Sequence, residues 1–506
     1  MTDPDPRPGS GSGSDRGSGS GSDRGPAAVP DAATLAERID ALMARARSDL
    51  AELVAIPSVA DPRQFPPEEC ARAARWVADA FTEAGLIDVR LEETPDGSHA
   101  VLGHRPGPPG SPTVLLYCHY DVQPPLGEAA WTSPPFTLTE RDGRWYGRGT
   151  ADCKGNIVMH LTALRALGDA LPVGLKFVAE GSEEQGTGGL EEYVAAHPGD
   201  FRADALLICD TGNAAVGRPT ATTALRGLAD LVVTVTTLRG DLHSGMFGGP
   251  APDALAALIQ ILSTLRDPDG GTRVDGLDCT GTWSGVPYEE ERFRADACVL
   301  DGVRLTGSGT VADRLWARPA VTVLGIDCPP VVGSAAAVPA KARARVSLRV
   351  PPGTDSEAAA AALTAHLTAA APWGARVSVE KQGIGSPFRP ATDGPAYRAM
   401  GRAMGQAYGR PMEFLGQGGS IPLCNVLAGT CPDAEIILMG VEEPRCLIHA
   451  PDESVDPTEI RNMALVEALF LLDYASARRP RSGYGDGDGD GDGYGRGRSN
   501  GEGTGK

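Results

Sequence analysis

A short apolar run that ends in a histidine and an aspartate sets the first constraint on this chain. Residues 113–118 (Thr-Val-Leu-Leu-Tyr-Cys) predict a buried strand. His119 and Asp121 follow, and Pro124 and Pro125 prevent the strand from continuing. Open α/β sheets bind ligands at the carboxyl ends of their strands. A histidine with a carboxylate two residues on suits a zinc ligand and its orienting partner. A structural histidine beside a turn aspartate would give the same pattern.

Strand and helix signals alternate on both sides of this run. Amphipathic helices are expected over residues 32–56 and 67–84, and strands and helices then alternate as far as residue 209. This alternation is typical of a sheet with helices on both faces. Further on, residues 228–238 and 342–350 predict strands with one apolar face, as in a half-exposed sheet.

We therefore predict an α/β fold in two domains, in which a mixed-sheet domain is interrupted by a smaller α+β domain. The expected segments are a Gly/Ser-rich tail over residues 1–26, the larger domain over residues 27–222 and 392–480, the inserted domain over residues 223–391, and a Gly/Asp-rich tail over residues 481–506.

Composition excludes several classes of function. The 506 residues carry a formal net charge of −20, which argues against nucleic acid and anionic membranes as partners. No apolar run reaches the roughly 18 residues that a membrane span needs. The ten cysteines are scattered without a CxxC pair, which favours reduced thiols and a cytoplasmic location.

Four further stretches place acidic or imidazole groups at the ends of predicted strands or in a tight loop. The groups are Asp152 in a glycine-flanked loop, Glu183 and Glu184 after the strand predicted at residues 173–179, Asp210 after residues 206–209, and His449 after another apolar run. Each could be a turn residue, a solvated helix start or a structural histidine. Three carboxylates within residues 180–184 are costly unless a cation offsets their charge. Their joint occurrence favours a metal site.

Together these stretches resemble a family of two-zinc metallopeptidases. The family includes acetylornithine deacetylase, succinyl-diaminopimelate desuccinylase, aminoacylase, cytosolic non-specific dipeptidase and carnosinase, and the similarity is strongest to the dipeptidase branch. The matching motifs are HYDVQP at 119–124, GRG at 147–149 with Asp152, Lys154 and Gly155, EG and EE within 180–184, Asp210, DLHSG at 241–245, GGSIP at 418–422, and His449. The resemblance implies a catalytic domain of the zinc-exopeptidase type with an inserted lid and dimerisation domain.

The resemblance also implies a dinuclear metal centre. In it, His119 and Asp210 hold one metal, Glu184 and His449 hold the other, and Asp152 bridges both. Two divalent ions per subunit are expected, Zn²⁺ first and Mn²⁺ as the alternative, because both accept imidazole and carboxylate ligands.

Catalytic and substrate contacts follow from the same resemblance. Asp121 orients the neighbouring histidine, and Glu183 is the general base that takes a proton from metal-bound water and returns it to the departing amine. Arg349 binds the C-terminal carboxylate of the substrate through its bidentate guanidinium, with Gly419 and Ser420 beside it. His243 reaches into the active site of a neighbouring subunit.

A homodimer is expected for a second reason. The strand predicted at residues 228–238 would be prone to aggregation if its edge stayed unpaired. Pairing that edge with the same strand of a second copy would give a closed two-fold dimer.

Three functions compete. The first is a peptidase that cleaves dipeptides or short peptides with a free C-terminal carboxylate. The second is an amidase of the deacetylase or desuccinylase type that acts on N-acyl amino acids. The third is a non-catalytic binding protein, which the intact Glu183 and the five ligand positions disfavour.

Overall fold

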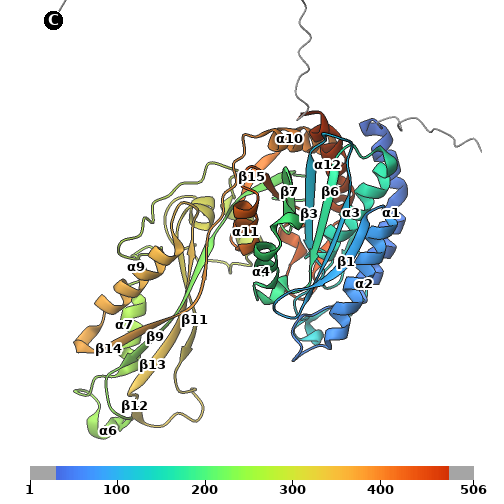
Figure 1. Ribbon diagram of the computed structural model, residues 1–506. Helices are drawn as coiled ribbons and strands as arrows, with labels where there is room; N and C mark the ends of the chain where they lie inside the picture. Colours follow the sequence, from blue (N-terminus) through green and yellow to red (C-terminus); the bar gives the residue numbers. More distant parts are fainter. Residues whose placement is uncertain (1–29, 478–506) are drawn as a thin grey trace, which may run out of the picture.

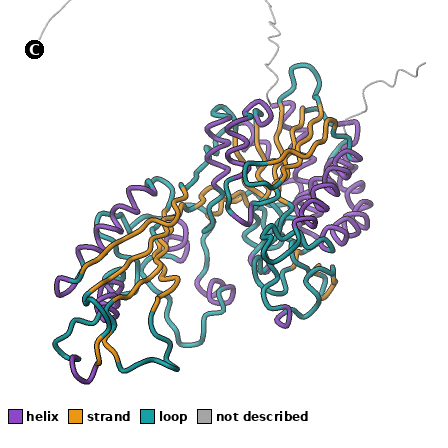
Figure 2. The backbone as a smooth tube through the Cα atoms, turned by 60° about the horizontal axis from the view of Figure 1, so that its bottom comes forward, coloured by secondary structure: helices purple, strands orange, loops and turns teal. Residues whose placement is uncertain are grey.

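The computed structural model describes residues 30–477, so the two predicted tails lie outside the described residues. Figure 1 shows two lobes, each built around a sheet. The sheet of the larger lobe has eight strands, and that of the smaller lobe has four. In the turned view of Figure 2, most strands again fall into two separate groups, one in each lobe. The predicted mixed α/β fold with a second, smaller α+β unit is confirmed.

The large sheet is mixed. Its order is β1 (Ile87–Glu93), β2 (His99–Arg105), β6 (Gly174–Glu180), β3 (Thr113–His119), β7 (Ala205–Cys209), β16 (Glu435–Met439), β8 (Thr220–Leu225) and β15 (Glu413–Gln417). The four central strands β6, β3, β7 and β16 run parallel to one another. Their carboxyl ends therefore meet at one edge of the sheet.

Helices cover both faces of this sheet. One face packs against α1 (Ala32–Val54), α2 (Pro67–Glu83), α3 (Lys154–Leu167), α10 (Pro395–Tyr408) and α12 (Pro457–Ala477), and the other against α4 (Gly189–Ala196), α5 (Pro198–Phe201) and α11 (Pro422–Thr430). In β3, Leu116 packs on the first face and Leu115 on the second. Burial on both sides explains why β3 is a continuous apolar run.

The small lobe is an antiparallel sheet covered on one face. Its order is β11 (Ala320–Asp327), β13 (Lys341–Val350), β9 (Gly227–Thr236) and β14 (Arg376–Gly385). Helices α7 (Ala254–Ser263) and α9 (Ser356–Ala369) pack on the apolar residues of β9 and β13. The domain boundary predicted between residues 222 and 223 falls within β8, which pairs in the large sheet. We therefore place the start of the small lobe at Gly227.

One expectation about this lobe is wrong. The strand predicted at residues 228–238 is β9, which pairs with β13 on one side and β14 on the other. It therefore has no free edge. The sheet ends instead at β11 and β14, and β11 exposes Val323, Leu324 and Ile326.

Short elements complete the described part of the chain. In the large lobe these are β4 (Thr139–Arg141), β5 (Arg144–Tyr146) and β17 (Ser454–Val455), which form a three-stranded sheet. Helix α8 (Glu290–Asp296) contacts the same lobe, since its Arg292 donates a hydrogen bond to the backbone oxygen of Ala214. In the small lobe the short elements are β10 (Leu242–His243), α6 (Ser244–Phe247) and β12 (Ala337–Val338). Among the helices within residues 30–477, none combines the length and apolar character that a membrane crossing requires.

Candidate active site

The strand ends of the large sheet bring the predicted metal-binding residues together. His119 is the last residue of β3, and Asp210 follows β7 directly. Glu183 and Glu184 begin a short 3-10 helix, η3 (Glu183–Gln185), just beyond β6. Because β6, β3 and β7 are parallel neighbours, these side chains gather at one edge of the sheet. Asp152 enters from the loop that precedes α3.

Asp152 lies between two histidines. One of its carboxylate oxygens is 2.9 Å from Nε2 of His119, and the other is 3.0 Å from Nε2 of His449. The same nitrogen of His119 lies 3.2 Å from Oδ1 of Asp210, and that of His449 lies 3.2 Å from Oε2 of Glu184. The five residues thus form two donor groups that share the Asp152 carboxylate. This is the arrangement that two cations with one bridging ligand require.

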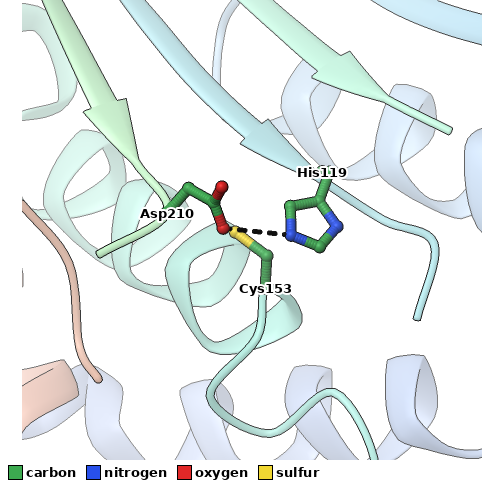
Figure 3. Close-up of side chains that lie close together, drawn as sticks. All are labelled: His119, Cys153 and Asp210. Carbon is green, nitrogen blue, oxygen red and sulfur yellow. Dashed lines mark hydrogen bonds and ion pairs between the residues drawn. The ribbon is translucent and has the colours of Figure 1, made fainter. Parts of the chain in front are cut away.

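Cys153 is a member of this cluster that the sequence did not reveal. Figure 3 shows its sulfur beside His119 and Asp210. The thiol donates a hydrogen bond to the backbone oxygen of Cys209 at 2.9 Å. Burial raises the pKa of Cys153 to about 12. In this hydrogen bond the side chain is a thiol, which differs from the thiolate that metals bind.

Carboxylates outnumber imidazoles in this cluster. Burial, and then the charge of Asp152, raises the pKa of Glu184 to about 7. Burial, and then the charge of Asp210, raises the pKa of Glu183 well above its ordinary value. Hydrogen bonds to Asp152 and Glu184 raise the pKa of His449 to about 11. Acidic groups this close together hold protons unless a cation offsets their charge.

Two buried carboxylate oxygens without hydrogen-bond partners also indicate that the cluster binds cations. Oε1 of Glu184 and Oε1 of Glu442 are buried without a hydrogen-bond partner among the described residues. Carboxylate oxygens of Asp152, Asp210 and Glu442 lie within 4.8 Å of one another. Buried polar atoms are seldom left unpaired. Two imidazoles surrounded by carboxylate oxygens fit Zn²⁺, or Mn²⁺ in a more oxygen-rich site.

Asp121 connects one predicted ligand to the glutamate pair. It is fully buried, and its carboxylate accepts hydrogen bonds from the backbone N–H groups of Glu183 at 3.2 Å and Glu184 at 3.0 Å. Its Oδ1 lies 3.4 Å from Nδ1 of His119, and its backbone oxygen lies 3.1 Å from the same nitrogen. Asp121 therefore fixes both the imidazole and the start of η3.

A cavity of about 870 Å³ opens beside this cluster and is lined by residues of both lobes. Among the predicted site residues, its lining contains Glu183, Glu184, Arg349, Gly419, Ser420 and His449. Arg349 comes from β13 of the small lobe. The cavity is therefore lined by acidic groups of the large lobe and by a guanidinium of the small lobe.

His243 is the one predicted site residue that the structure places neither at the acidic cluster nor in the lining of this cavity. It is exposed at the end of β10 and does not line the cavity. Figure 1 shows the adjoining α6 at the tip of the small lobe, on the side away from the large sheet. Within one chain, His243 therefore does not contact the metal-binding cluster.

Arg226 is a second residue that the sequence did not reveal. It lies in the link between β8 and β9, is 8% exposed, and has no ion-pair partner among residues 30–477. Burial, and then the charge of Arg349, lowers its pKa to about 10. A Cβ atom at Gly418 would lie 2.8 Å from its Nη2. Two neighbouring guanidinium groups without a carboxylate partner favour an anionic ligand.

Comparisons with known proteins identify a matching family model, similar sequences and a similar solved structure. Residues 115–473 match the model of peptidase family M20/M25/M40. The chain is 47% identical over 408 residues to a cysteinylglycine-S-conjugate dipeptidase of Corynebacterium striatum, a match that covers 79% of this chain and 90% of the relative. It is 30% identical over 404 residues to a Cys-Gly metallodipeptidase of Schizosaccharomyces pombe, covering 74% and 84% of the two chains. The crystal structure of human carnosine dipeptidase 1 superposes with a TM-score of 0.74 at 25% identity, over 88% of this chain and 99% of that one.

Proposed function

The chain belongs to peptidase family M20/M25/M40, and on this premise we propose that it is a dinuclear metallodipeptidase. The observation that carries the proposal is the Asp152 carboxylate, whose two oxygens face His119 and His449 at 2.9 and 3.0 Å. We assign His119 and Asp210 to one metal, Glu184 and His449 to the other, and Asp152 to both.

The residues of the cluster divide the chemistry among them. Two divalent ions, when bound, supply Lewis acidity that polarises the scissile carbonyl and acidifies a water molecule. Glu183 accepts a proton from the attacking water at its carboxylate and delivers it to the nitrogen of the leaving amine. Burial and the charge of Asp210 raise the pKa of Glu183 well above its ordinary value, which makes its carboxylate a stronger proton acceptor. Asp121 holds His119 and the backbone of Glu183 in place.

The cationic side of the cavity suits the carboxylate end of a peptide. Arg349 lines the cavity, with Gly419 and Ser420 beside it. We propose that these residues bind the C-terminal carboxylate of the substrate. The buried guanidinium of Arg226, near Arg349, adds positive charge that attracts this carboxylate. A guanidinium fork can bind a carboxylate through two hydrogen bonds.

We propose dipeptides of the Cys-Gly type as substrates, including those with a substituted cysteine sulfur. The 47% identical relative bears the name of such an enzyme. N-acyl amino acids remain the second class to test, because they share the C-terminal carboxylate.

The assembly that we propose is a cytoplasmic homodimer. Strand β11 is an edge of the small sheet and exposes Leu324. Val331 and Val332 in the loop beyond it are 95% and 90% exposed. An apolar strand edge of this kind is prone to pairing with another chain, and a two-fold dimer would cover it. A cytoplasmic location is consistent with ten free cysteines within residues 30–477.

Two measurements test the function. Dialysis of the purified protein against a chelator should abolish dipeptide hydrolysis, and Zn²⁺ or Mn²⁺ should restore it. A panel should then compare Cys-Gly, an S-substituted Cys-Gly, N-acetyl amino acids and N-succinyl amino acids by kcat/KM. We expect the dipeptides to be preferred by at least about tenfold. Full activity in metal-free protein, or a preference for the N-acyl amino acids, would overturn the proposal.

A further inference from the structure

Glu453 occupies a buried position that no step of the proposed reaction uses. It lies four residues after His449 and is 0% exposed. Strand β17, which begins at the next residue, pairs with β5, which ends just before Gly147. This pairing places Glu453 next to the loop that leads to Asp152.

The carboxylate of Glu453 is saturated with hydrogen bonds from that loop. One oxygen accepts from Nη1 of Arg148 at 2.7 Å and from the backbone N–H of Gly149 at 3.0 Å. The other accepts from the backbone N–H groups of Ala151 at 3.0 Å and Asp152 at 3.2 Å. A carboxylate offers about four lone-pair sites. All four are used, and one of the donors is the backbone of the bridging residue itself.

Arg148 extends this contact to two more loops. It is 1% exposed, and its Nη2 donates to the backbone oxygens of Pro124 at 3.2 Å and Ala450 at 3.3 Å. Pro124 lies just beyond His119 and Asp121, and Ala450 follows His449 directly. The Arg148–Glu453 pair therefore joins the three chain segments that carry His119, Asp152 and His449.

From this geometry we propose that Glu453, together with Arg148, is a positioning residue for the metal centre. Neither side chain touches the substrate cavity or a metal-binding oxygen or nitrogen. Their role is to hold the backbone of Asp152 so that its two oxygens stay aimed at the two donor groups. Partners that orient metal ligands typically contribute 10- to 100-fold to metal affinity. The inference rests on the dinuclear centre of the proposed function.

The test measures metal affinity apart from activity. Metal-free full-length protein is titrated with Co²⁺, and binding is followed by the visible absorption of the ion. Glu453→Gln keeps the shape of the side chain, removes its charge, and turns an amide N–H towards N–H donors. We expect the dissociation constant for Co²⁺ to rise by about 10- to 100-fold. At saturating Co²⁺, kcat should recover towards the wild-type value, and KM should change little.

Glu467→Gln is the matched control. Glu467 is also 0% exposed and pairs with a single side chain, since its Oε2 lies 2.6 Å from Nδ1 of His160. Among residues 30–477, no hydrogen bond or ion pair joins the Glu467 side chain to the three ligand-bearing segments, so the control should lower Tm without weakening Co²⁺ binding.

The outcomes separate the inference from the proposed function. If the wild-type protein does not bind two Co²⁺ ions, the dinuclear metal centre of the proposed function is contradicted. Two bound ions in the wild type with unchanged affinity in Glu453→Gln, or an equal loss in the control, would overturn the positioning role alone. If Glu453→Gln does not fold, Arg148→Lys takes its place, because lysine keeps the charge near Glu453 but cannot also reach both carbonyl oxygens. The same affinity criteria then apply.

Discussion

Glu183 and Glu184 are adjacent residues with different tasks, and this difference is testable. Oε2 of Glu184 lies against His449, whereas Glu183 lines the cavity without a side-chain hydrogen bond to a donor of the cluster. We predict that Glu183→Gln retains two metal ions per chain by elemental analysis. Hydrolysis should fall by about 10²-fold or more, because the amide cannot accept the proton of water.

Glu184→Gln provides the control for this prediction. It should lose part of the bound metal as well as activity, because Glu184 is assigned as a ligand. Loss of metal from Glu183→Gln, with normal metal content in Glu184→Gln, would show that the two roles are reversed.

Arg349 should act on substrate binding more than on chemistry. It lines the cavity and has no ion-pair partner among the described residues. Hydrogen bonds to charged groups are worth about 1.5–3 kcal/mol, so Arg349→Met should raise KM for a dipeptide by about 10- to 100-fold. The effect should largely vanish for a dipeptide amide, which lacks the carboxylate. An equal loss for both substrates would assign Arg349 to another part of the substrate.

The residues to which we assign the chemistry have local sequence signals, whereas the residues that we propose to support them do not. His119, Asp152 and His449 stand beside glycines, prolines or strand ends, and these signals are local. Glu453 also precedes a strand, but the role that we propose for it depends on hydrogen-bond donors about 300 positions away in the sequence, at Gly149 to Asp152. Only the pairing of β17 with β5 brings them together.

At the scale of elements, the strongest local patterns gave the right structures. The apolar run at β3 and the alternating pattern of β13 both form strands, because burial on two faces and on one face leaves distinct patterns. The edge of the small sheet could not be found in this way. Whether β9 is central depends on pairing with β13 and β14, which lie more than 100 residues further along the chain.

The corrected edge leads to a prediction about assembly. Leu324 on β11 is 53% exposed, so Leu324→Lys should cost little stability within one chain but should oppose pairing of β11 across a dimer. Light scattering after size-exclusion chromatography should show a shift from dimer to monomer. The matched control is Ile87→Lys, since Ile87 is 49% exposed on β1 at the edge of the large sheet. A dimer that withstands Leu324→Lys as well as Ile87→Lys would show that β11 is not the interface.

At the scale of the whole molecule, the two lobes contribute different parts of one cavity. The large lobe supplies the acidic cluster, and the small lobe supplies Arg349. His243 belongs to the small lobe but is exposed away from this cavity. A catalytic role for His243 therefore requires a second subunit, as the resemblance to the family implies.

A mixture of two inactive variants tests whether the sites are shared. His243→Ala and Glu183→Gln, made as separate proteins, should each have little activity. After random exchange of subunits in equal amounts, about half of the dimers are mixed. One site of each mixed dimer then carries both defects and the other carries neither. About a quarter of all sites should therefore be intact, and activity should recover towards a quarter of the wild-type value. If native mass spectrometry shows mixed dimers but no activity returns, His243 does not act across the interface.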